Sequence, residues 1–271
     1  MRVELLGLTS THSVKIATYN VNGIKARLPR LIEWLEETAP DVACLQELKS
    51  SDETFPEADI RAAGYGAVWH GQKGFNGVAI LARGNDPIER RRGLPGDPDD
   101  THSRYIEAEV DGVVIGSIYL PNGNPQPGPK FDYKLAWMER LIEHAASLWN
   151  SELPVVLTGD YNVIPTDHRD DVFSARAMAN DALSQPESRA AFRRLLNAGW
   201  TDAIRTLQPT GPAYTFWDYQ AGAWQRDAGF RIDHFLLSPV TADRLDNAGI
   251  DRDYRAREKA SDHVPVWITL R

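Results

Sequence analysis

The sequence has little cysteine, no long apolar run and no excess of positive charge. Its 271 residues include a single cysteine, Cys44, which excludes an internal disulfide framework and a four-thiolate zinc site. One cysteine is typical of a reducing compartment and predicts a cytoplasmic protein. No run reaches the roughly 18 apolar residues of a membrane-spanning helix. The N-terminal apolar patch is too short for a secretion signal, so we expect no membrane association.

Positive charge is outnumbered, because 30 Lys and Arg face 38 Asp and Glu and the formal net charge is −8. This balance argues against a protein that coats nucleic acid by bulk attraction, which needs a clustered positive field. A nuclease is not excluded, since carboxylates that hold a divalent cation present a positive ion to the substrate. The 42% hydrophobic and 25% charged residues are typical of a folded globular chain.

Several enzyme classes lack their usual motif. The chain contains no GxxxxGK[ST] phosphate loop, no GxGxxG after a strand, no HExxH and no GxSxG. The histidines show no metal-ligand spacing. Nucleotide-driven, dinucleotide-dependent, zinc-protease and serine-hydrolase functions therefore have no support here.

Short apolar runs alternate with helical patterns. Leu28, Leu31, Ile32 and Leu35 recur at i, i+3, i+4 and i+7, which predicts a helix between two strands. Further helices are expected at 135–145 and 191–196. The predicted strands are 14–18, 42–45, 78–81, 106–110, 113–119, 155–157, 235–237 and 264–270.

The order of these elements predicts an α/β chain with mixed sheets. Asp111-Gly112 indicates a two-residue hairpin, and therefore at least one antiparallel pairing. No repeat or charged linker divides the chain, so we expect one catalytic domain over 14–271, preceded by a tail at 1–13. The Arg90-Arg91-Arg92 run is interpreted as a solvated turn.

Acids and amides follow the buried strands. Glu47 comes directly after the apolar run at 42–45, and Asp160 and Asn162 follow the run at 155–157. Carboxyl ends of strands are where open α/β sheets build their sites. Taken singly, each motif is equally consistent with a helix cap or an ordinary turn.

Further polar residues lie beside other strands. Asp233 stands among apolar residues, where an unpaired charge is costly, so a partner such as His263 is expected. A carboxylate on one ring nitrogen would fix the tautomer of that histidine and raise its basicity. Asn20 with Asn22, and Tyr119 with Asn122, follow two more strands. For each of these groups a structural role alone remains open.

These strand-end clusters contain Asp, Glu, Asn, Tyr and His, with no thiolate and no serine elbow. Hard oxygen ligands select Mg²⁺ or Mn²⁺, and Mg²⁺ prefers one or two carboxylates plus waters. Phosphodiester hydrolysis fits this set, because a metal, amides and an imidazole stabilise the developing charge while an acid orients or deprotonates water.

The same residues fall in short sequence segments, or blocks, that match the pattern of a known family. The blocks are 15–27, 44–49, 76–81, 118–123, 159–163, 231–233 and 261–265, and together they span 14–271 in family order. In these blocks the chain resembles the exonuclease III family of apurinic/apyrimidinic endonucleases. Its superfamily also holds pancreatic-type deoxyribonucleases, inositol polyphosphate phosphatases and neutral sphingomyelinases. The resemblance implies a four-layered α/β sandwich, two mixed sheets face to face and flanked by helices.

The resemblance also implies roles for individual residues. Metal ligands would be Glu47, Asn20 and Asp262; Asp160 would act on the water; Asn162, His263, Tyr119 and Asn122 would contact phosphate or water, with Asp233 pairing with His263. Asn22 stands where some relatives carry Asp, which puts a second metal-binding carboxylate in doubt.

Substrate class rests on an aromatic stretch. The segment 214–219 and Phe230 resemble the loop with which this family encloses a base-less sugar that is flipped out of the duplex. Flipping a nucleotide out of the duplex costs least at abasic sites. The residues expected to bind substrate are Asn22, Lys25, Arg27, Asn76, Phe216, Trp217, Phe230 and Ile232. The alternative that these aromatics, Trp217 included, are simply core residues remains open.

The leading hypothesis is a monomeric, Mg²⁺-dependent DNA repair enzyme acting on duplex DNA, with Mn²⁺ as a substitute. It would incise 5′ to abasic sites and remove 3′ phosphates, blocking groups or nucleotides. One alternative is a phosphoesterase of the same superfamily that acts on lipid or inositol phosphates. Another is a nucleic-acid-binding module without catalysis.

Overall fold

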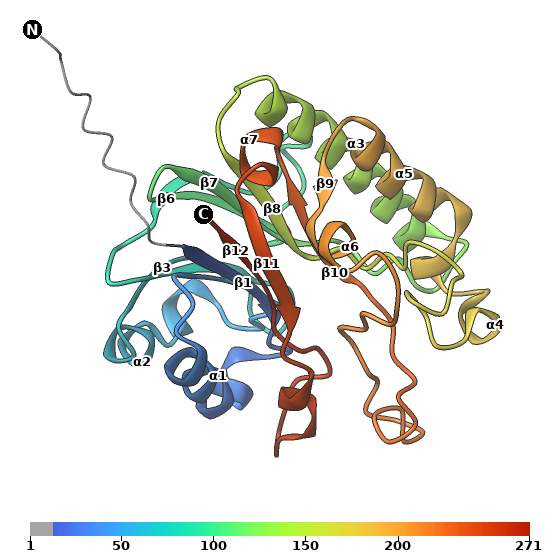
Figure 1. The fold of residues 1–271 in the computed structure, drawn as a ribbon, viewed down its shortest axis with the longest axis horizontal. Helices are drawn as coiled ribbons and strands as arrows, with labels where there is room; N and C mark the ends of the chain where they lie inside the picture. The colour runs from blue at the N-terminus through green and yellow to red at the C-terminus, as the bar shows by residue number, and fades with distance from the viewer. Residues whose placement is uncertain (1–12) are drawn as a thin grey trace, which may run out of the picture.

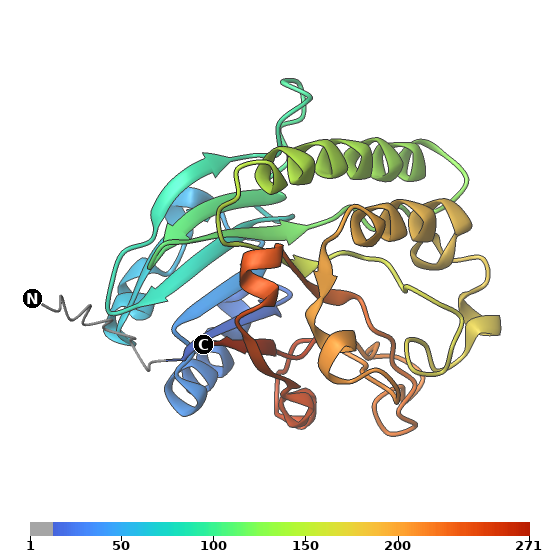
Figure 2. The ribbon, with the colours of Figure 1, turned by 45° about the horizontal axis from the view of Figure 1, so that its top comes forward.

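The computed structural model describes residues 13–271, which form two six-stranded sheets (Figure 1, Figure 2). In order across the first sheet the strands are β11 (Leu245–Ile250), β12 (Val266–Leu270), β1 (Val14–Asn20), β2 (Val42–Gln46), β4 (Val78–Arg83) and β3 (Tyr65–His70). Across the second they are β5 (Ile88–Arg92), β6 (Tyr105–Val110), β7 (Val113–Tyr119), β8 (Val155–Asp160), β10 (Asp233–Leu237) and β9 (Thr201–Asp202). Apart from Ser13, the predicted tail lies outside the described residues.

Helices cover the outer face of each sheet. α1 (Ile24–Thr38) and α2 (Glu57–Ala62) pack on the first sheet, and α3 (Pro129–Trp149) and α5 (Pro186–Asn197) on the second (Figure 1, Figure 2). Shorter elements are α4 (Ala175–Met178), α6 (Ala203–Leu207), α7 (Pro239–Ala242), η1 (Asp52–Thr54), η2 (Ala182–Ser184) and η3 (Arg252–Ala256). None of the helices in 13–271 has the length and apolar character needed to cross a membrane.

Three apolar layers hold the sandwich together. Ile80, Ile115 and Phe235 are buried between the two sheets, whereas Trp34 of α1 is buried against the first sheet and Trp137 of α3 against the second. Each such side chain contributes about 1.5–3 kcal/mol on burial, so the layers are the main source of stability. The predicted four-layered α/β sandwich is confirmed.

The eight predicted strands and the Asp111-Gly112 hairpin are all present. Val110 pairs with Val113, and Asp111 and Gly112 have φ of 49° and 78°, the left-handed pair that a tight antiparallel hairpin requires. The prediction of a solvated turn at Arg90–Arg92 is wrong, because these residues belong to β5. That edge strand is exposed along its whole length and therefore carries no apolar alternation to detect.

Strand direction brings the polar residues to one edge. β1 and β2 run parallel with Asn20 opposite Gln46, and β7 and β8 run parallel with Tyr119 opposite Asp160. β10 is antiparallel to β8, so its first residue, Asp233, also lies opposite Asp160. The carboxyl ends of four strands and the start of a fifth therefore share one rim.

Candidate active site

Buried hydrogen bonds join the sheets at this rim. Asn20 at the end of β1 donates its amide to Asp160 Oδ2 at the end of β8 (2.9 Å). Gln46 at the end of β2 donates to Ser117 Oγ in β7 (3.0 Å). Because both bonds are buried, they fix the two sets of strand ends relative to each other.

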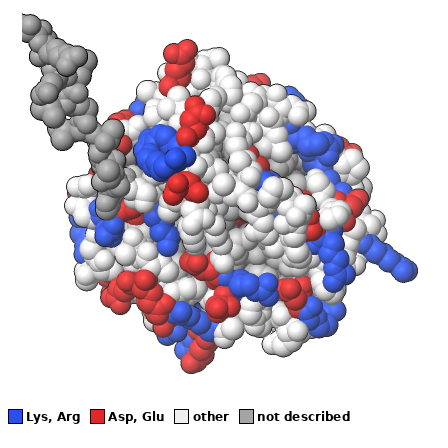
Figure 3. Space-filling view, in the orientation of Figure 1, with Lys and Arg blue, Asp and Glu red and all other residues white. Residues whose placement is uncertain are grey.

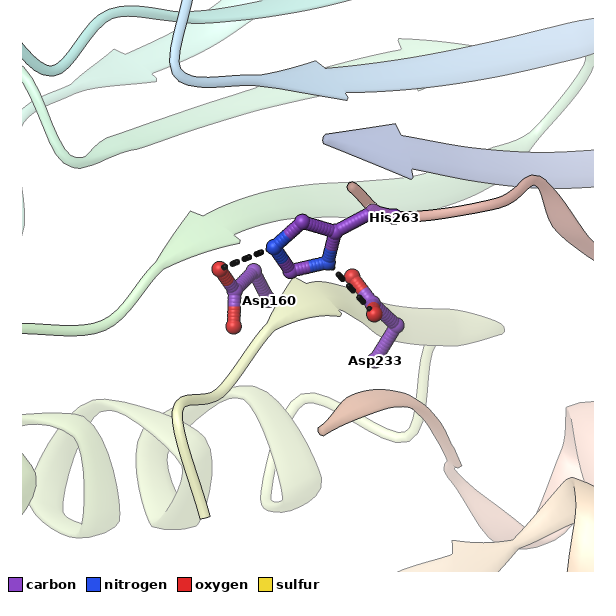
Figure 4. A group of neighbouring side chains, drawn as sticks. All are labelled: Asp160, Asp233 and His263. Atoms are coloured by element: carbon purple, nitrogen blue, oxygen red, sulfur yellow. Dashed lines mark hydrogen bonds and ion pairs between the residues drawn. The ribbon is translucent and has the colours of Figure 1, made fainter. Parts of the chain in front are cut away.

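Asp160, His263 and Asp233 form a buried relay (Figure 4). His263 Nδ1 lies 2.8 Å from Asp233 Oδ2, and its Nε2 faces Asp160 Oδ2 at 3.6 Å. The Ser261 hydroxyl accepts the backbone N–H of His263 (3.2 Å), and the Thr215 hydroxyl accepts that of Asp233 (3.1 Å). Asp233 thus sets the orientation of the imidazole and directs its other nitrogen at Asp160.

Burial and mutual repulsion set the protonation of this relay. Burial raises the pKa of Asp160, with Asp233 adding to the effect and His263 opposing it. For His263, burial favours the neutral ring, but the Asp233 and Asp160 carboxylates outweigh it and raise the pKa of the imidazole. The group therefore combines a carboxylate of increased basicity with an imidazolium next to it.

Asn20, which the resemblance implies as a metal ligand, lies between two acids. Its Nδ2 donates to both Glu47 Oε2 (3.0 Å) and Asp160 Oδ2 (2.9 Å), while its Oδ1 accepts the backbone N–H of Asn22 (2.9 Å). In this structure Asn20 thus bridges the two carboxylates, and its role as a ligand stays a prediction.

Glu47 is held at the rim in an unusual backbone conformation. Its φ is 58°, in the left-handed region that non-glycine residues rarely adopt. Asn22, Asn76 and Asn162, from three other loops at this end, also have positive φ, of 46°, 48° and 47°. Backbone strain of this kind persists where surrounding contacts enforce it and is concentrated at functional sites.

A chain of polar contacts leads from Glu47 to Asp262. Lys49 Nζ lies 3.0 Å from Glu47 Oε1 and donates to Asn22 Oδ1 (2.6 Å). Asn22 Nδ2 in turn donates to Asp262 Oδ1 (3.1 Å). Lys49 and Asn22 thereby place two acids, Glu47 and Asp262, in one connected group.

Glu47 and Asp262 are the residues best suited to hold a divalent cation. Both line the same cavity and offer the hard oxygen donors that Mg²⁺ and Mn²⁺ prefer. Asp160, Asp233 and His263 also present ligand-type atoms within 4.8 Å of one another. In that group, however, Asp233 engages Nδ1 and Asp160 faces Nε2, so a proton relay accounts for the arrangement.

Tyr119, Asn122 and Asn162 form the opposite side of the site. Burial raises the pKa of Tyr119 well above its ordinary value, with Glu47 and Asp160 adding to the effect, so its hydroxyl remains a donor. Asn162 donates its amide to the Leu120 carbonyl (2.8 Å), and Asn122 donates to Asn162 Oδ1 (3.4 Å).

A cavity of about 380 Å³ opens among these residues. Its polar side contains Glu47, Tyr119, Asn122, Asp160, Asn162, Asp262 and His263. Phe216, Phe230 and Ile232 form an apolar wall, in which the two phenyl rings stack with centroids 4.7 Å apart and Phe216 meets His263 edge to face. The cavity therefore pairs a charged floor with a flat apolar surface.

Four lining residues were not predicted: Met178, Asp181, Leu183 and Asp218. The first three belong to the long segment 166–186, and Asp218 lies in the aromatic stretch next to Trp217. Their loops carry no apolar periodicity and no family block except the aromatic one. Only proximity in the folded chain identifies them.

Five predicted substrate-binding residues do not line the cavity, and Asn22, described above, is one of them. Trp217 is fully buried, donates its indole N–H to Asp227 (3.0 Å) and packs edge to face on Trp224. Asn76 is nearly buried and donates to Gln72. Lys25 is exposed and Arg27 donates to the Tyr219 hydroxyl (3.2 Å), both outside the cavity.

One face of the molecule carries mixed charge. On the face drawn in Figure 3, Lys and Arg are interspersed with Asp and Glu and form no continuous basic surface. This matches the net charge of −8. This face therefore offers no clustered positive field for a polyanion.

Comparison with known proteins identifies relatives over nearly the whole chain. Residues 17–263 match the model of the endonuclease/exonuclease/phosphatase family. The exodeoxyribonuclease III of Haemophilus influenzae is 34% identical over 268 residues, covering 95% of this chain and 100% of that protein.

Comparison with solved structures also identifies relatives over nearly the whole chain. An AP endonuclease from Archaeoglobus fulgidus is 37% identical with a TM-score of 0.90, and the 3′ phosphatase NExo from Neisseria, bound to a product DNA hairpin, is 37% identical with a TM-score of 0.89. In both cases the match covers 95% of this chain and 99% of the other. With its sandwich fold and its strand-end acids on one rim, the chain belongs to the endonuclease/exonuclease/phosphatase family.

Proposed function

We propose that this protein is a metal-dependent DNA repair nuclease of the exonuclease III type. It cleaves the phosphodiester 5′ to abasic sites in duplex DNA and removes 3′ phosphates, blocking groups or nucleotides. The observation that carries the proposal is the Asp233–His263–Asp160 relay on the floor of a cavity with an aromatic wall. Relatives named as an exodeoxyribonuclease, an AP endonuclease and a 3′ phosphatase support the substrate class.

Asp160 acts on the attacking water. Its raised pKa makes the carboxylate a stronger base than a free Asp, and its contact with Asn20 keeps one oxygen in a fixed direction. A positioned base of this kind contributes about 10²–10⁴-fold to rate. The water gives its proton to Asp160 as its oxygen attacks phosphorus. The bond between phosphorus and the 3′ oxygen of the preceding nucleotide breaks, and that oxygen leaves as a 3′ hydroxyl after taking a proton from solvent.

His263 and the amides stabilise the phosphate. The imidazolium, held by Asp233, donates from Nε2 to a phosphate oxygen as negative charge develops. Asn162, Asn122 and the protonated Tyr119 hydroxyl offer neutral donors from the other side of the cavity. These donors lie on strand ends, which keeps them preorganised.

Glu47 and Asp262 hold the cation, for which we propose Mg²⁺, with Mn²⁺ as a substitute. The donor set supports this choice, since two carboxylates plus waters suit a small hard ion. When bound, the ion neutralises charge on the non-bridging phosphate oxygens. Asn20 and Lys49 keep Glu47 in place.

The aromatic wall selects the sugar. Phe216, Phe230 and Ile232 offer an apolar surface to a deoxyribose without a base, and flipping such a residue costs little. Outside the cavity, Asn22, Lys25, Arg27 and Asn76 contact the DNA backbone, and Trp217 supports the wall. We further propose that residues 14–271 act as one domain, as a monomer in the cytoplasm, which the single buried cysteine suits.

The test is a nicking assay on a labelled duplex with one central abasic site. With Mg²⁺ we expect a single cut 5′ to the site, no cut in EDTA, and recovery when Mg²⁺ or Mn²⁺ is added back. Glu47→Gln should lose most activity at saturating DNA while its DNA affinity stays within a few-fold. Parallel duplexes with a 3′ phosphate and with intact ends measure the balance of activities.

A protein that leaves the abasic duplex uncut with every divalent ion would contradict the proposal. Inositol polyphosphate and a phosphorylated lipid serve as control substrates for the other branches of the superfamily. Turnover of either one faster than the abasic duplex would favour a phosphoesterase. DNA binding without any cleavage would favour a module that has lost catalysis.

A further inference from the structure

One buried cation beneath the cavity has no part in the chemistry described so far. Lys134 lies on α3, where its side chain is completely buried. Its Nζ donates to two backbone carbonyls, those of Asn122 (3.0 Å) and Asn162 (2.5 Å). Lysine is almost never buried without a paired acid, so this arrangement calls for an explanation.

The charge of Lys134 has no direct partner among residues 13–271. No carboxylate lies within 4 Å of its Nζ, and Asp160 and Asp181 attract it only from farther away. Burial lowers the pKa of Lys134 to about 7, against the pull of those acids. An ammonium in this position weakens the fold relative to an apolar side chain of the same size.

The two carbonyls belong to the loops that carry the neutral donors. Asn122 follows β7 and Asn162 follows β8, and both side chains line the cavity. The loops also meet directly, because Asn162 donates to the Leu120 carbonyl (2.8 Å) and Asn122 donates to Asn162 Oδ1 over a longer distance (3.4 Å). Lys134 adds a bond to the backbone of each loop, next to the Cα that carries each amide side chain.

Gly123 shows how closely the lysine stem fits under the first loop. Its φ is 91°, and a Cβ at this position would lie 2.6 Å from Lys134 Cδ. The loop after β7 therefore rests on the lysine side chain itself. A change in the length or charge of residue 134 would move the backbone that carries Asn122.

We propose that Lys134 is a positioning residue, which joins the loops after β7 and β8 so that Asn122 and Asn162 present their amides to the phosphate. The inference rests on the proposed function, because it assigns these amides to the phosphate. Lys134 itself touches neither the cavity nor the substrate. Its effect is on the transition state, since displacement of a donor by about 1 Å can cost on the order of 10²-fold in rate.

The first experiment compares Lys134→Met with wild type on the abasic duplex in Mg²⁺. We expect kcat to fall about tenfold to a hundredfold with KM changed less than threefold. The control is His144→Gln, also buried on α3 and bonded to Glu107 (2.8 Å) away from the cavity. It should lower thermal stability and leave both constants near wild type.

A double-mutant cycle with Asn162→Ala tests whether Lys134 acts through that amide. If it does, Lys134→Met should cost less than threefold in kcat once Asn162 is alanine. Lys134→Arg keeps the charge and several donors, and should recover at least tenfold of the activity that methionine loses. Should Lys134→Met fail to fold by circular dichroism, Lys134→Gln takes its place with the same expected direction.

The outcomes separate this inference from the proposed function. If wild type nicks the duplex and Lys134→Met matches its kcat, or if the losses from Lys134 and Asn162 multiply in full, the positioning role is wrong and the proposed function stands. If wild type does not nick, or Asn162→Ala is fully active, the assigned chemistry fails at its own step. A fall in kcat equal to that of His144→Gln would make Lys134 structural only, and would also overturn the inference.

Discussion

Two buried clusters of charged side chains lie at the start of β10, and they differ in charge balance. One is centred on Arg231 and the other on Asp233, two residues further along the chain. One surrounds Arg231 and contains Asp171, Asp202 and Arg205; the other contains Asp233, Asp160 and His263. The first sets two arginines against two aspartates. The second sets one histidine against two aspartates.

In the Arg231 cluster every charge meets an opposite charge. Arg231 Nε lies 2.7 Å from Asp171 and its Nη1 lies 2.8 Å from Asp202, while Arg205 reaches Asp171 at 2.8 Å. Burial alone would raise the pKa of Asp171, but Arg231 and the hydrogen bonds from Arg205 lower it to about 2. This cluster stabilises the ionised carboxylates.

The relay leaves negative charge unmatched. The pKa of Asp160 is raised, and Asp233 Oδ1 is buried with no hydrogen-bond partner among residues 13–271. The comparison shows that similar residues at similar depth serve stability when balanced and reactivity when not. A cation and a water proton are the positive charges that the second cluster lacks and that its proposed reaction supplies.

The largest effect is expected when a substitution removes the unmatched negative charge of the relay. Asp160→Asn should lower kcat by about 10²–10⁴-fold in the nicking assay, because the base is lost.

The same variant should change the pH dependence of stability. Since the folded pKa of Asp160 lies above its ordinary value of 3.8, its stabilising contribution is complete below that value and is lost as pH rises through the folded pKa. The variant should therefore melt above wild type at pH 8. Asp253→Asn, at an exposed position in η3, is the control and should change neither quantity.

Breaking the balanced cluster should affect stability instead. Arg231→Met leaves Asp171 and Asp202 buried beside only Arg205, and should lower the free energy of unfolding by about 3–5 kcal/mol in urea titrations. Arg194→Met removes an exposed pair with Glu139 and should cost less than about 1 kcal/mol. Equal losses in the two variants would mean that burial does not distinguish these ion pairs.

A smaller effect is expected when the relay loses its outer carboxylate. Asp233→Asn should lower the pKa of His263, since that carboxylate is the main group that raises it. NMR titration of the imidazole measures the shift, and we expect the alkaline limb of the rate profile to move to lower pH with it. An unchanged imidazole pKa would show that Asp160 alone controls the ring.

The smallest effect concerns acid stability. The folded pKa of Asp171, about 2, lies below its ordinary value of 3.8, so its contribution is present above 3.8 and is lost as pH falls toward 2. Unfolding titrations between these values should show a steeper loss for wild type than for Asp171→Asn. Parallel curves would indicate that other acids carry the pH dependence.

Much of the fold and part of the site were predictable. Apolar runs locate a buried strand wherever both faces are covered, as in β2 and β8, and the residues that follow such strands reach a common rim because parallel strands end together. The cost of burying a lone charge also predicts that Asp233 has a partner, and the family resemblance implies that the partner is His263. The edge strand β5 could not be predicted from apolar alternation, because neither of its faces is buried.

Details of the site were not predictable, because they depend on contacts between distant segments. No local pattern shows that the Asn20 amide faces two carboxylates, that Trp217 is fully buried outside the cavity or that Met178 lines the cavity. In the sequence, Lys134 has the character of an ordinary polar helix residue. Its burial depends on two loops that fold over it.

By itself the sequence determined which chemical groups are present, the strands they follow and the kind of reaction they suit, because residue type and apolar periodicity are local properties. Only the tertiary structure decided which acid keeps a partner and which does not, since burial and opposing charge are set by neighbours far apart in the chain. Asp171 and Asp160 are the same residue type, and their pKa values move in opposite directions for that reason alone.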